Sequence, residues 1–321
     1  MDALSEVLGA VHMTGAIFLD AEFTAPWGVS VPDARMVASV LAPTAEHIVS
    51  YHLVIDGDMV VRDESGAELG LTAGDIVIMP LGARHRLSGG VATKFVDSGL
   101  AVKRLSPGEV IKFSLGGGGA KTHIICGFFG CQRQAIHLFL AGLPSILRIP
   151  VRGDASGAWI ESTIRHLVSE AESSRPGRSA LLSRMAEALF IESMRRYMES
   201  LPEQQTGWLA AARDPIVGRV LSAIHHEPGR RWTIAELIET AGSSRSVVTE
   251  RFARLLGETP ISYLTSWRLH VAARTLETTR QTVLQVGFEV GYESEASFNR
   301  AFKREFGIPP ARYRKQTRES V

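Results

Sequence analysis

The 321-residue chain contains only two cysteines, Cys126 and Cys131, which are too few for a disulfide framework and favour a reducing compartment. It has no uncharged apolar run of about 18 residues that could cross a membrane, and no basic N-terminal segment typical of a secretory signal. It also lacks a phosphate-binding glycine loop and a Gly-x-Ser-x-Gly nucleophile elbow. These absences predict a cytoplasmic protein without a membrane partner, and they give no support to an enzyme.

The charge is distributed unevenly along the chain. Residues 209–321 hold 17 Lys+Arg and 12 Asp+Glu, a net charge of +5, whereas the remainder has a net charge of −4. A basic part beside an acidic part indicates that only the C-terminal third meets phosphate groups. The length allows two or three domains, and a composition of 45% hydrophobic and 21% charged residues is ordinary for a globular protein.

Residues 1–150 are expected to form mostly strands, arranged as a sandwich or barrel. Short runs rich in β-branched residues indicate this: Met36–Leu41, Ile48–Ile55, Met59–Val61, Asp75–Met79 and Thr122–Phe129. Residues 151–205 change to helical spacing, with helices predicted at Trp159–Glu172 and Ser179–Leu201 that either cover the barrel or form a dimer surface. A polar linker is predicted at 202–213, followed by helices alone from Asp214 onward. The fold class is therefore α+β, with two domains.

The C-terminal third contains two copies of a helix-turn-helix pattern. In the first copy Thr233 and Glu236 have the spacing of a capping box, and Gly242 allows a tight turn before a second helix at about 243–256. Either Ser243 or Ser244 is expected to cap that helix. In the second copy the turn glycine is Gly291, and its distance to Phe302 is one residue longer than the distance from Gly242 to the matching Phe252. The second helix of this copy is predicted at about 294–306.

Polar side chains remain on the outer faces of these second helices, where we expect them to contact DNA. Arg can donate two hydrogen bonds to the edge of a guanine, and Asn can form a pair of hydrogen bonds with adenine. Lys or Arg residues further along the helix can contact phosphates. Two such helices would occupy successive major-groove turns, roughly 34 Å apart. For any single residue a solvated helix face is the alternative. The predicted DNA-contacting residues are Ser243, Arg245, Ser246, Thr249 and Arg254, and Glu293, Ser294, Ser297, Asn299, Arg300, Lys303 and Arg304.

Residues 214–316 contain the segments Trp232–Leu237, Ala241–Ser246, Phe252–Arg254, Gly257–Leu264, Arg268–Leu269, Ala272–Leu276 and Val290–Gly307. With these segments they resemble the AraC-type DNA-binding domain. The resemblance implies a sequence-specific regulator of transcription that binds double-stranded promoter DNA, forms a homodimer and, as an activator, contacts RNA polymerase. Two positions depart from the family, which usually has Ala where this chain has Ile238 and Gly287.

The N-terminal part has a motif of Gly74, Pro80, Gly82 and His85, in which five residues separate the first Gly from Pro and two separate the second Gly from His. This spacing resembles the second cupin motif, and residues 1–150 therefore resemble the cupin sensor domain found ahead of AraC-type domains. The first cupin motif requires His-x-His, but Ser50 stands two residues before His52, so the first histidine is missing. The resemblance implies a cupin-like sensor at 1–150, a helical dimerisation or linker segment at 151–205 and a DNA-binding domain at 214–316.

Three kinds of site are considered for this barrel. The first is a pocket for an unknown small-molecule effector, which would act through different affinities for two protein states. The second is a metal site, because His52, His85 and Cys126 suit a Zn-like or other divalent ion. The third is redox sensing by Cys126 or Cys131, although a five-residue offset on one strand points their side chains to opposite faces. Hydrogen-bonded structural histidines and an inert buried thiol are the alternatives.

Two other functions are weighed against a DNA-binding regulator. A cupin enzyme with non-haem iron would use His52 and His85 with an acid from Glu46, Glu64 or Glu68, none of which has the cupin spacing. Alternatively, the helix-turn-helix pair would contact another protein, which the basic charge of the C-terminal third argues against. The sequence therefore predicts a transcriptional regulator that senses a signal and is not an enzyme.

Overall fold

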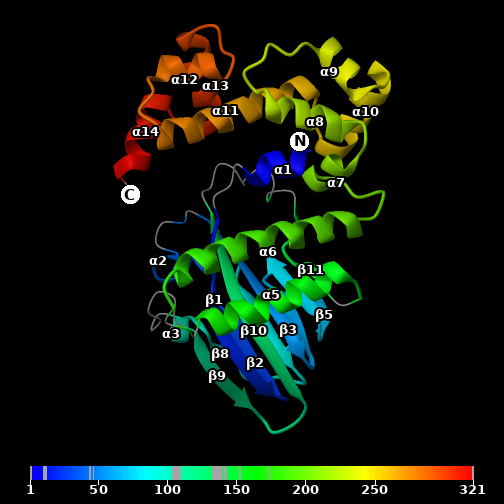
Figure 1. The fold of residues 1–321 in the computed structure, drawn as a ribbon, viewed down its shortest axis with the longest axis vertical. Coiled ribbons are helices and arrows are strands. Elements are labelled where there is room, and N and C mark those ends of the chain that lie inside the picture. Colours follow the sequence, from blue (N-terminus) through cyan, green and yellow to red (C-terminus); the bar gives the residue numbers. More distant parts are fainter. Residues whose placement is uncertain are drawn as a thin grey trace. The chain divides into compact units, whose positions relative to one another are not determined.

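The computed structural model describes residues 2–9, 13–42, 45, 47–102, 110–131, 140, 143–151, 153–171, 173 and 175–319. The chain forms two compact units (Figure 1). The β-rich unit contains His12–Arg133 and Leu143–Ser200, and the helical unit contains Met1–Val11, Gln134–Gly142 and Leu201–Val321. Within the described chain, every helix is too short or too polar to span a lipid bilayer. The predicted α+β fold class with two domains is confirmed.

The β-rich unit consists of two sheets with an apolar core between them. The strand order is β11-β6-β3-β10-β1-β9 in one sheet and β5-β4-β7-β2-β8 in the other. Neighbouring strands are antiparallel except in the pairs β1–β9 and β2–β8. The bounds are β1 Met13–Thr24, β2 Trp27–Val31, β3 His47–Asp56, β4 Asp58–Asp63, β5 Glu68–Thr72, β6 Asp75–Met79, β7 His85–Gly89, β8 Val96–Asp97, β9 Ile111–Gly116, β10 Lys121–Cys131 and β11 Leu147–Pro150; a short α3 (Gly99–Val102) follows β8.

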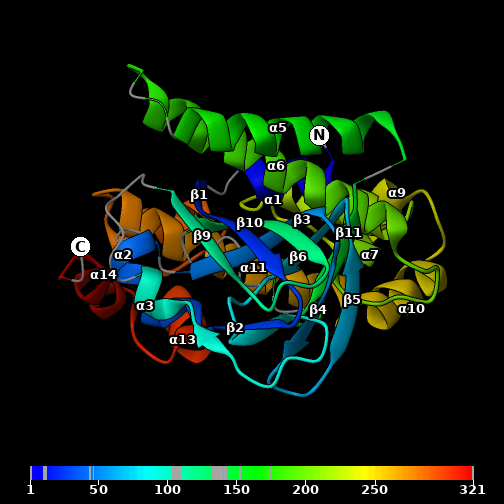
Figure 2. The same cartoon turned by 90° about the horizontal axis from the view of Figure 1, so that it is seen from below.

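Two helices cover the outer face of the six-stranded sheet: α5 (Ala155–Ala171) and α6 (Arg178–Ser200) (Figures 1 and 2). Alternation along β10 directs Cys126 to the core between the sheets and Phe129 to the helices. The ring of Phe129 lies 5.1 Å from that of Phe190 in α6. One face of the two helices therefore covers the sheet, and a dimer surface on their other face stays a prediction.

The predicted strand at Met36–Leu41 is wrong. The chain there forms a single 3-10 turn, η1 (Ala34–Met36), followed by α2 (Ala38–Leu41). Asp33 begins the turn because its carboxylate accepts a hydrogen bond from the backbone nitrogen of Arg35. A run this short does not contain enough periodicity to separate strand from helix.

The second unit is helical throughout its described residues and contains the two predicted helix-turn-helix motifs. Its C-terminal helices are α7 Trp208–Arg213, α8 Val217–His226, α9 Ile234–Ala241, α10 Arg245–Leu256, α11 Pro260–Thr278, α12 Val283–Glu289, α13 Glu295–Phe306 and α14 Pro310–Glu319. The linker predicted at 202–213 is wrong in its second half, because α7 lies there. Trp208 and Leu209 are buried and give α7 a place in the core of this unit.

The N-terminal helix α1 (Ala3–Gly9) belongs to this helical unit, where it packs on α7 and α8. Leu4, Val7 and Leu8 are at most 6% exposed, and the Glu6 carboxylate lies 3.2 Å from Nδ1 of His226. The first residues of the chain therefore do not fold with the expected 1–150 domain. The assignment of sensing, dimerisation and DNA binding to the three predicted segments stays a prediction.

Candidate nucleic-acid interface and sensor cluster

Short-range capping sets the geometry of the first helix-turn-helix. The Thr233 hydroxyl accepts from the backbone of Glu236, whose carboxylate accepts from the backbone of Thr233, as the predicted capping box requires. Gly242 ends α9 in the left-handed conformation with a φ of 60°. Ser244, rather than Ser243, caps α10 by accepting from the backbone of Val247. These interactions are local in sequence, which explains why the spacing of residues predicted them.

The second helix-turn-helix has the same design with one more residue in its turn. A second capping box begins α12, and Ser294 caps α13. Two residues separate Gly291 from Ser294, whereas one residue separates Gly242 from Ser244. Both α10 and α13 have 12 residues, so the extra residue lies in the turn and the two helices are equal in length.

Buried aromatic rings orient α13. Phe298 and Phe302 are 0% exposed, with ring centroids 5.5 Å apart, and Phe306 lies 4.5 Å from Phe302. Residues four apart share one face of a helix, so these rings leave the opposite face of α13 to solvent. Arg300 and Arg304 are exposed there.

Most of the predicted DNA-contacting side chains are exposed. No ion pair among the described residues engages the cations of this set, so their charge is available to a ligand. The exposed members are Arg245, Ser246, Thr249, Arg254, Glu293, Ser294, Arg300, Lys303 and Arg304, while Ser243, Ser297 and Asn299 are partly buried.

Four members of the predicted set have partners inside the protein. The Ser246 hydroxyl oxygen lies 3.1 Å from that of Ser244. Ser294 and Ser297 bond to each other, with 3.0 Å between their hydroxyl oxygens. Glu293 forms an ion pair of 3.2 Å with Arg231, an exposed cation that sequence reasoning missed. Because a carboxylate repels phosphate, Glu293 is the least suited of the predicted contacts.

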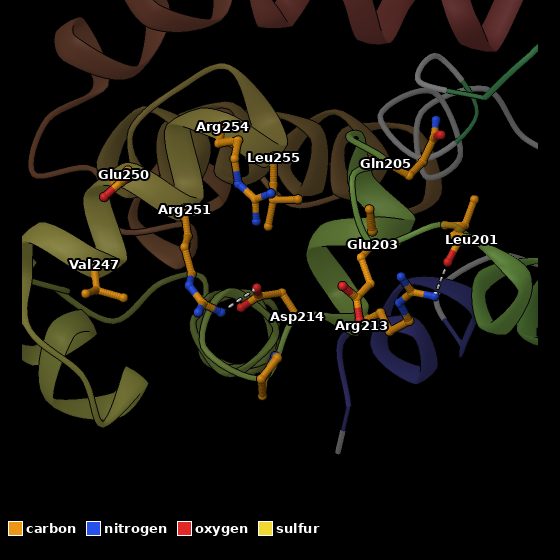
Figure 3. Close-up of a pocket in the computed structure, with 12 residues that line it drawn as sticks. Leu201, Glu203, Gln205, Arg213, Asp214, Val247, Glu250, Arg251, Arg254 and Leu255 are labelled. Carbon is orange, nitrogen blue, oxygen red and sulfur yellow. Dashed lines mark hydrogen bonds and ion pairs between the residues drawn. The ribbon is translucent and has the colours of Figure 1, made fainter.

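A groove of about 940 Å³ borders α10 (Figure 3). Arg254 lines it together with Arg213 and Arg251, which sequence reasoning did not single out. The Asp214 carboxylate accepts from Nη1 of Arg251 at 2.9 Å, and its other oxygen accepts from the backbone nitrogen of Val217 at 2.9 Å. Asp214 thus caps α8 and holds α10 beside it. The sequence signal for this role of Asp214 was an Asp shortly before an apolar helix, a residue type that commonly caps helix N-termini.

The family departure at Gly287 lies where α12 meets α13. A methyl group at this position would lie 3.1 Å from the ring of Phe298, closer than ordinary van der Waals contact. Phe298 therefore occupies the space that an alanine would fill. Ile238, the other departure, is partly buried on α9, and the effect of either residue on docking to DNA stays a prediction.

His52, His85 and Cys126 meet in the core of the β-rich unit. They come from β3, β7 and β10, and each is at most 2% exposed. Nδ1 of His52 lies 2.8 Å from Sγ of Cys126, and its Nε2 lies 2.8 Å from Nε2 of His85. Nδ1 of His85 lies 2.8 Å from the carbonyl oxygen of Ala83. The three candidate residues thus form a chain of hydrogen bonds.

The Ala83 carbonyl determines which atom is the donor in each hydrogen bond between His85, His52 and Cys126. Burial lowers the pKa of His85 to about 4, burial and the neighbouring His85 lower the pKa of His52, and burial raises the pKa of the Cys126 thiol. All three groups are therefore neutral at pH 7. Since a carbonyl only accepts, His85 has its proton on Nδ1 and accepts at Nε2. His52 then donates from Nε2 and accepts the Cys126 thiol proton at Nδ1.

This arrangement does not fit a shared metal ion. A Zn-like ion needs one donor atom from each ligand directed at one point, roughly 2.0–2.3 Å away. His52 instead directs one ring nitrogen to Cys126 and the other to His85. Among the residues that the structure describes, no group of three His, Cys, Asp or Glu side chains is placed to hold a metal.

The other candidates of the β-rich unit do not join this cluster. Glu64 and Glu68, two of the acids considered for an iron site, are exposed and each is paired with an arginine. Glu46 lies outside the described residues, as does the side chain of Cys131 at the end of β10. The redox role of Cys131 therefore stays a prediction.

Comparisons with known proteins agree with the two halves of this architecture. Residues 2–199 match the cupin family, and residues 237–316 match a helix-turn-helix domain family. The chain is 32% identical over 273 residues to an AraC-like transcription regulator of Streptomyces lividans, covering 84% of this chain and 88% of that protein. It is 27% identical over 321 residues to the HTH-type transcriptional regulator AlkR of Acinetobacter baylyi, covering 99% and 100%. Among solved structures, the DNA-binding domain of AdpA in complex with a target DNA is 31% identical and covers 33% of this chain and 95% of that chain, with a TM-score of 0.31.

Proposed function

The chain belongs to the AraC-like transcriptional regulators with a cupin domain, and we propose that α10 and α13 make its base contacts. Arg245 begins α10 and is exposed, which suits a paired contact with guanine, while Asn299 on α13 suits adenine. The observation that supports these roles is the polar outer face of two helices whose opposite faces are buried. Ser246 and Thr249 lie on the same side of α10 and complete its base-reading surface.

The remaining cations are proposed to contact phosphates. Arg254 lies near the end of α10, and Arg300, Lys303 and Arg304 follow along α13. Such contacts fix the register of the protein on DNA without reading its sequence. Ser243, Ser294 and Ser297, at the helix N-termini, are proposed to orient backbone N–H groups toward the DNA backbone.

The test is selection of genomic DNA fragments by the purified protein at physiological salt. We expect one recurring motif with two half-contacts a helical turn apart. Arg245→Ala should then relax the sequence preference at one base pair and cost about 1–3 kcal/mol of binding free energy. Lys303→Ala should lower the affinity for all DNA sequences equally, and should reduce the slope of log affinity against log salt concentration by about one. Equal weakening of all sequences by both substitutions would contradict the base-reading role of Arg245.

We propose that the protein is a homodimer joined through the outward face of α5 and α6. Trp159 is 44% exposed there, beside a hollow of about 290 Å³ lined also by Ala188 and Ile191. Large aromatic side chains of this kind are enriched at protein interfaces. In analytical ultracentrifugation, Trp159→Asp should shift the protein toward monomer. The control is Lys94→Asp, an exposed position between β7 and β8 of the five-stranded sheet, which α5 and α6 do not cover. An unchanged sedimentation coefficient for Trp159→Asp would rule out this face.

The signal is proposed to act through the chain of hydrogen bonds between His52, His85 and Cys126. A small-molecule or redox effector that alters these bonds would favour one of two protein states. The protein is proposed to act in the cytoplasm, where its DNA target lies, to contact RNA polymerase if it is an activator, and to catalyse no reaction. A cupin enzyme would be favoured only if purified protein contained iron and His85→Ala removed both the iron and a turnover.

A further inference from the structure

The chain leading into the first helix-turn-helix touches the turn of the second directly, beside the helix α11 that connects them. The loop between α8 and α9, residues 227–233, lies against the turn that follows α12. A methyl group on Gly229 would lie 2.3 Å from the carbonyl oxygen of Glu289, and one on Gly291 would lie 2.7 Å from the carbonyl oxygen of Gly229. The two backbones therefore meet at a distance that only glycine allows.

Arg268 of α11 binds this loop at the same place. Its Nε donates to the carbonyl oxygen of Pro228 at 2.7 Å, and its Nη2 donates to that of Arg230 at 2.7 Å. The same Nη2 would lie 2.8 Å from a methyl group on Gly291, so the guanidinium fills the space beside the second turn while it bonds the first loop. A planar group with several fixed donors suits two carbonyls at once.

The loop that Arg268 binds, residues 227–233, is also held by contacts between its own residues. The backbone nitrogen of Trp232 donates to the carbonyl of Arg230 at 2.8 Å, and its indole nitrogen donates to the carbonyl of Glu227 at 3.0 Å. The guanidinium of Arg230 lies over the Trp232 ring at 4.1 Å. A displacement imposed on the loop at Arg268 is therefore passed on to Thr233, which begins α9.

We propose that Arg268, with Gly229 and Gly291, fixes the position of α10 relative to α13 and so makes DNA binding depend on the spacing of the two half-contacts. Arg268 is a positioning residue in this proposal. The step from position to DNA rests on the proposed base contacts. Each inserted base pair adds about 3.4 Å and about 34–36° of rotation, which a rigid pair of helices cannot follow without losing one contact.

The position of the helices is measured first, without DNA, by pulsed electron spin resonance. Nitroxide labels at Glu250→Cys on α10 and Ala296→Cys on α13, both exposed positions, are placed in full-length protein without the two native cysteines. We expect one narrow distance distribution with Arg268 present, and a broader or shifted one with Arg268→Ala. Gly229→Ala should do the same without any change of charge, and Arg274→Ala on the same helix should not.

The result that overturns the proposal is a distribution that is equally narrow and centred at the same distance with and without Arg268. Arg268→Lys keeps the charge but cannot reach both carbonyls in the same geometry, so it should give an intermediate width. An Arg268→Lys protein that matched the wild type would show that charge alone holds the two motifs.

The second measurement uses the selected operator with one base pair added or removed between its half-contacts. The wild type should lose about tenfold or more in affinity, the cost of one lost base contact, whereas Arg268→Ala should lose less than about threefold. This ratio is unaffected by the fraction of folded protein. If Arg268 only contacts phosphate, its removal weakens all spacings by the same factor, which contradicts the proposal. If no operator is selected, the base contacts fail, while the distance measurement still decides the role of Arg268.

Discussion

His225, in the core of the helical unit, should make that unit less stable as the pH falls. The side chain is 6% exposed, and its ring lies 4.0 Å from that of Trp267. Tyr263 bonds its Nε2 at 2.8 Å, and Trp208 donates to the same hydroxyl at 2.7 Å, so Tyr263 gives its own proton to a neutral imidazole. Burial lowers the pKa of His225 from 6.5 to about 3. Its Nδ1 has no partner of normal geometry among the described residues, and the backbone of Ala3 in α1 opposes the shift only in part.

The sign of the effect follows from the neutral folded form. The unfolded chain takes up a proton below a pKa of 6.5, whereas the folded chain does so only near a pKa of about 3. Stability from this group is therefore complete above pH 6.5 and is lost as the pH falls toward 3. At pH 5 the loss amounts to about 2 kcal/mol of the free energy of unfolding.

The assay compares urea unfolding at about pH 7.5 and pH 5, followed by tryptophan fluorescence. His225→Phe keeps an aromatic ring in the stack but cannot titrate. The stability difference between the two pH values should therefore be about 2 kcal/mol smaller in this variant than in the wild type. His226→Gln, which changes the exposed neighbouring histidine, is the control and should keep most of the wild-type difference. An equal pH dependence in His225→Phe and wild type would refute the reasoning.

Three substitutions test the packing of the same unit by urea unfolding. Leu4→Asp places a charge in the contact of α1 with α7 and α8 and should cost about 3 kcal/mol or more. Its control, Ala311→Asp at an exposed position in the first turn of α14, should change stability by less than about 0.5 kcal/mol. Phe302→Ala removes a fully buried ring and should cost about 3–5 kcal/mol. Gly287→Ala should destabilise by up to about 1 kcal/mol, because the close contact with Phe298 outweighs the gain in helix propensity. A stabilising Gly287→Ala would show that Phe298 moves aside freely.

The features that the sequence predicted well are those encoded by neighbouring residues. The capping pair Thr233 and Glu236, and the turn glycines Gly242 and Gly291, act within a few residues of themselves, so their spacing contains the information. Because the helix-turn-helix pattern occurs twice, each copy supported the prediction made from the other. The sequence also grouped His52, His85 and Cys126, as possible ligands of one metal ion, and these three side chains do meet in the core.

Other features depend on contacts between distant residues, which spacing does not encode. Arg268 appeared only as part of a family pattern, since its two acceptor carbonyls lie about 40 residues earlier. The proton direction from Cys126 to His85 depends on the carbonyl of Ala83, a backbone group without any sequence signature. The short runs at Met36–Leu41 and Trp208–Arg213 were misassigned because periodicity needs a longer segment.

The packing of the N-terminal helix α1 is a feature that the sequence alone did not predict. Leu4, Val7 and Leu8 have the spacing of an apolar helix face, but spacing cannot say which surface that face covers. The structure places α1 on α7 and α8, so the helical unit contains segments from both ends of the chain. The helix lies close to His225, because the backbone of Ala3 raises the pKa of His225 in part against the lowering by burial. Acidification or loss of α1 should therefore weaken the same core. A change at the first residues of the chain then acts on the helix-turn-helix half, although more than two hundred residues separate them in sequence.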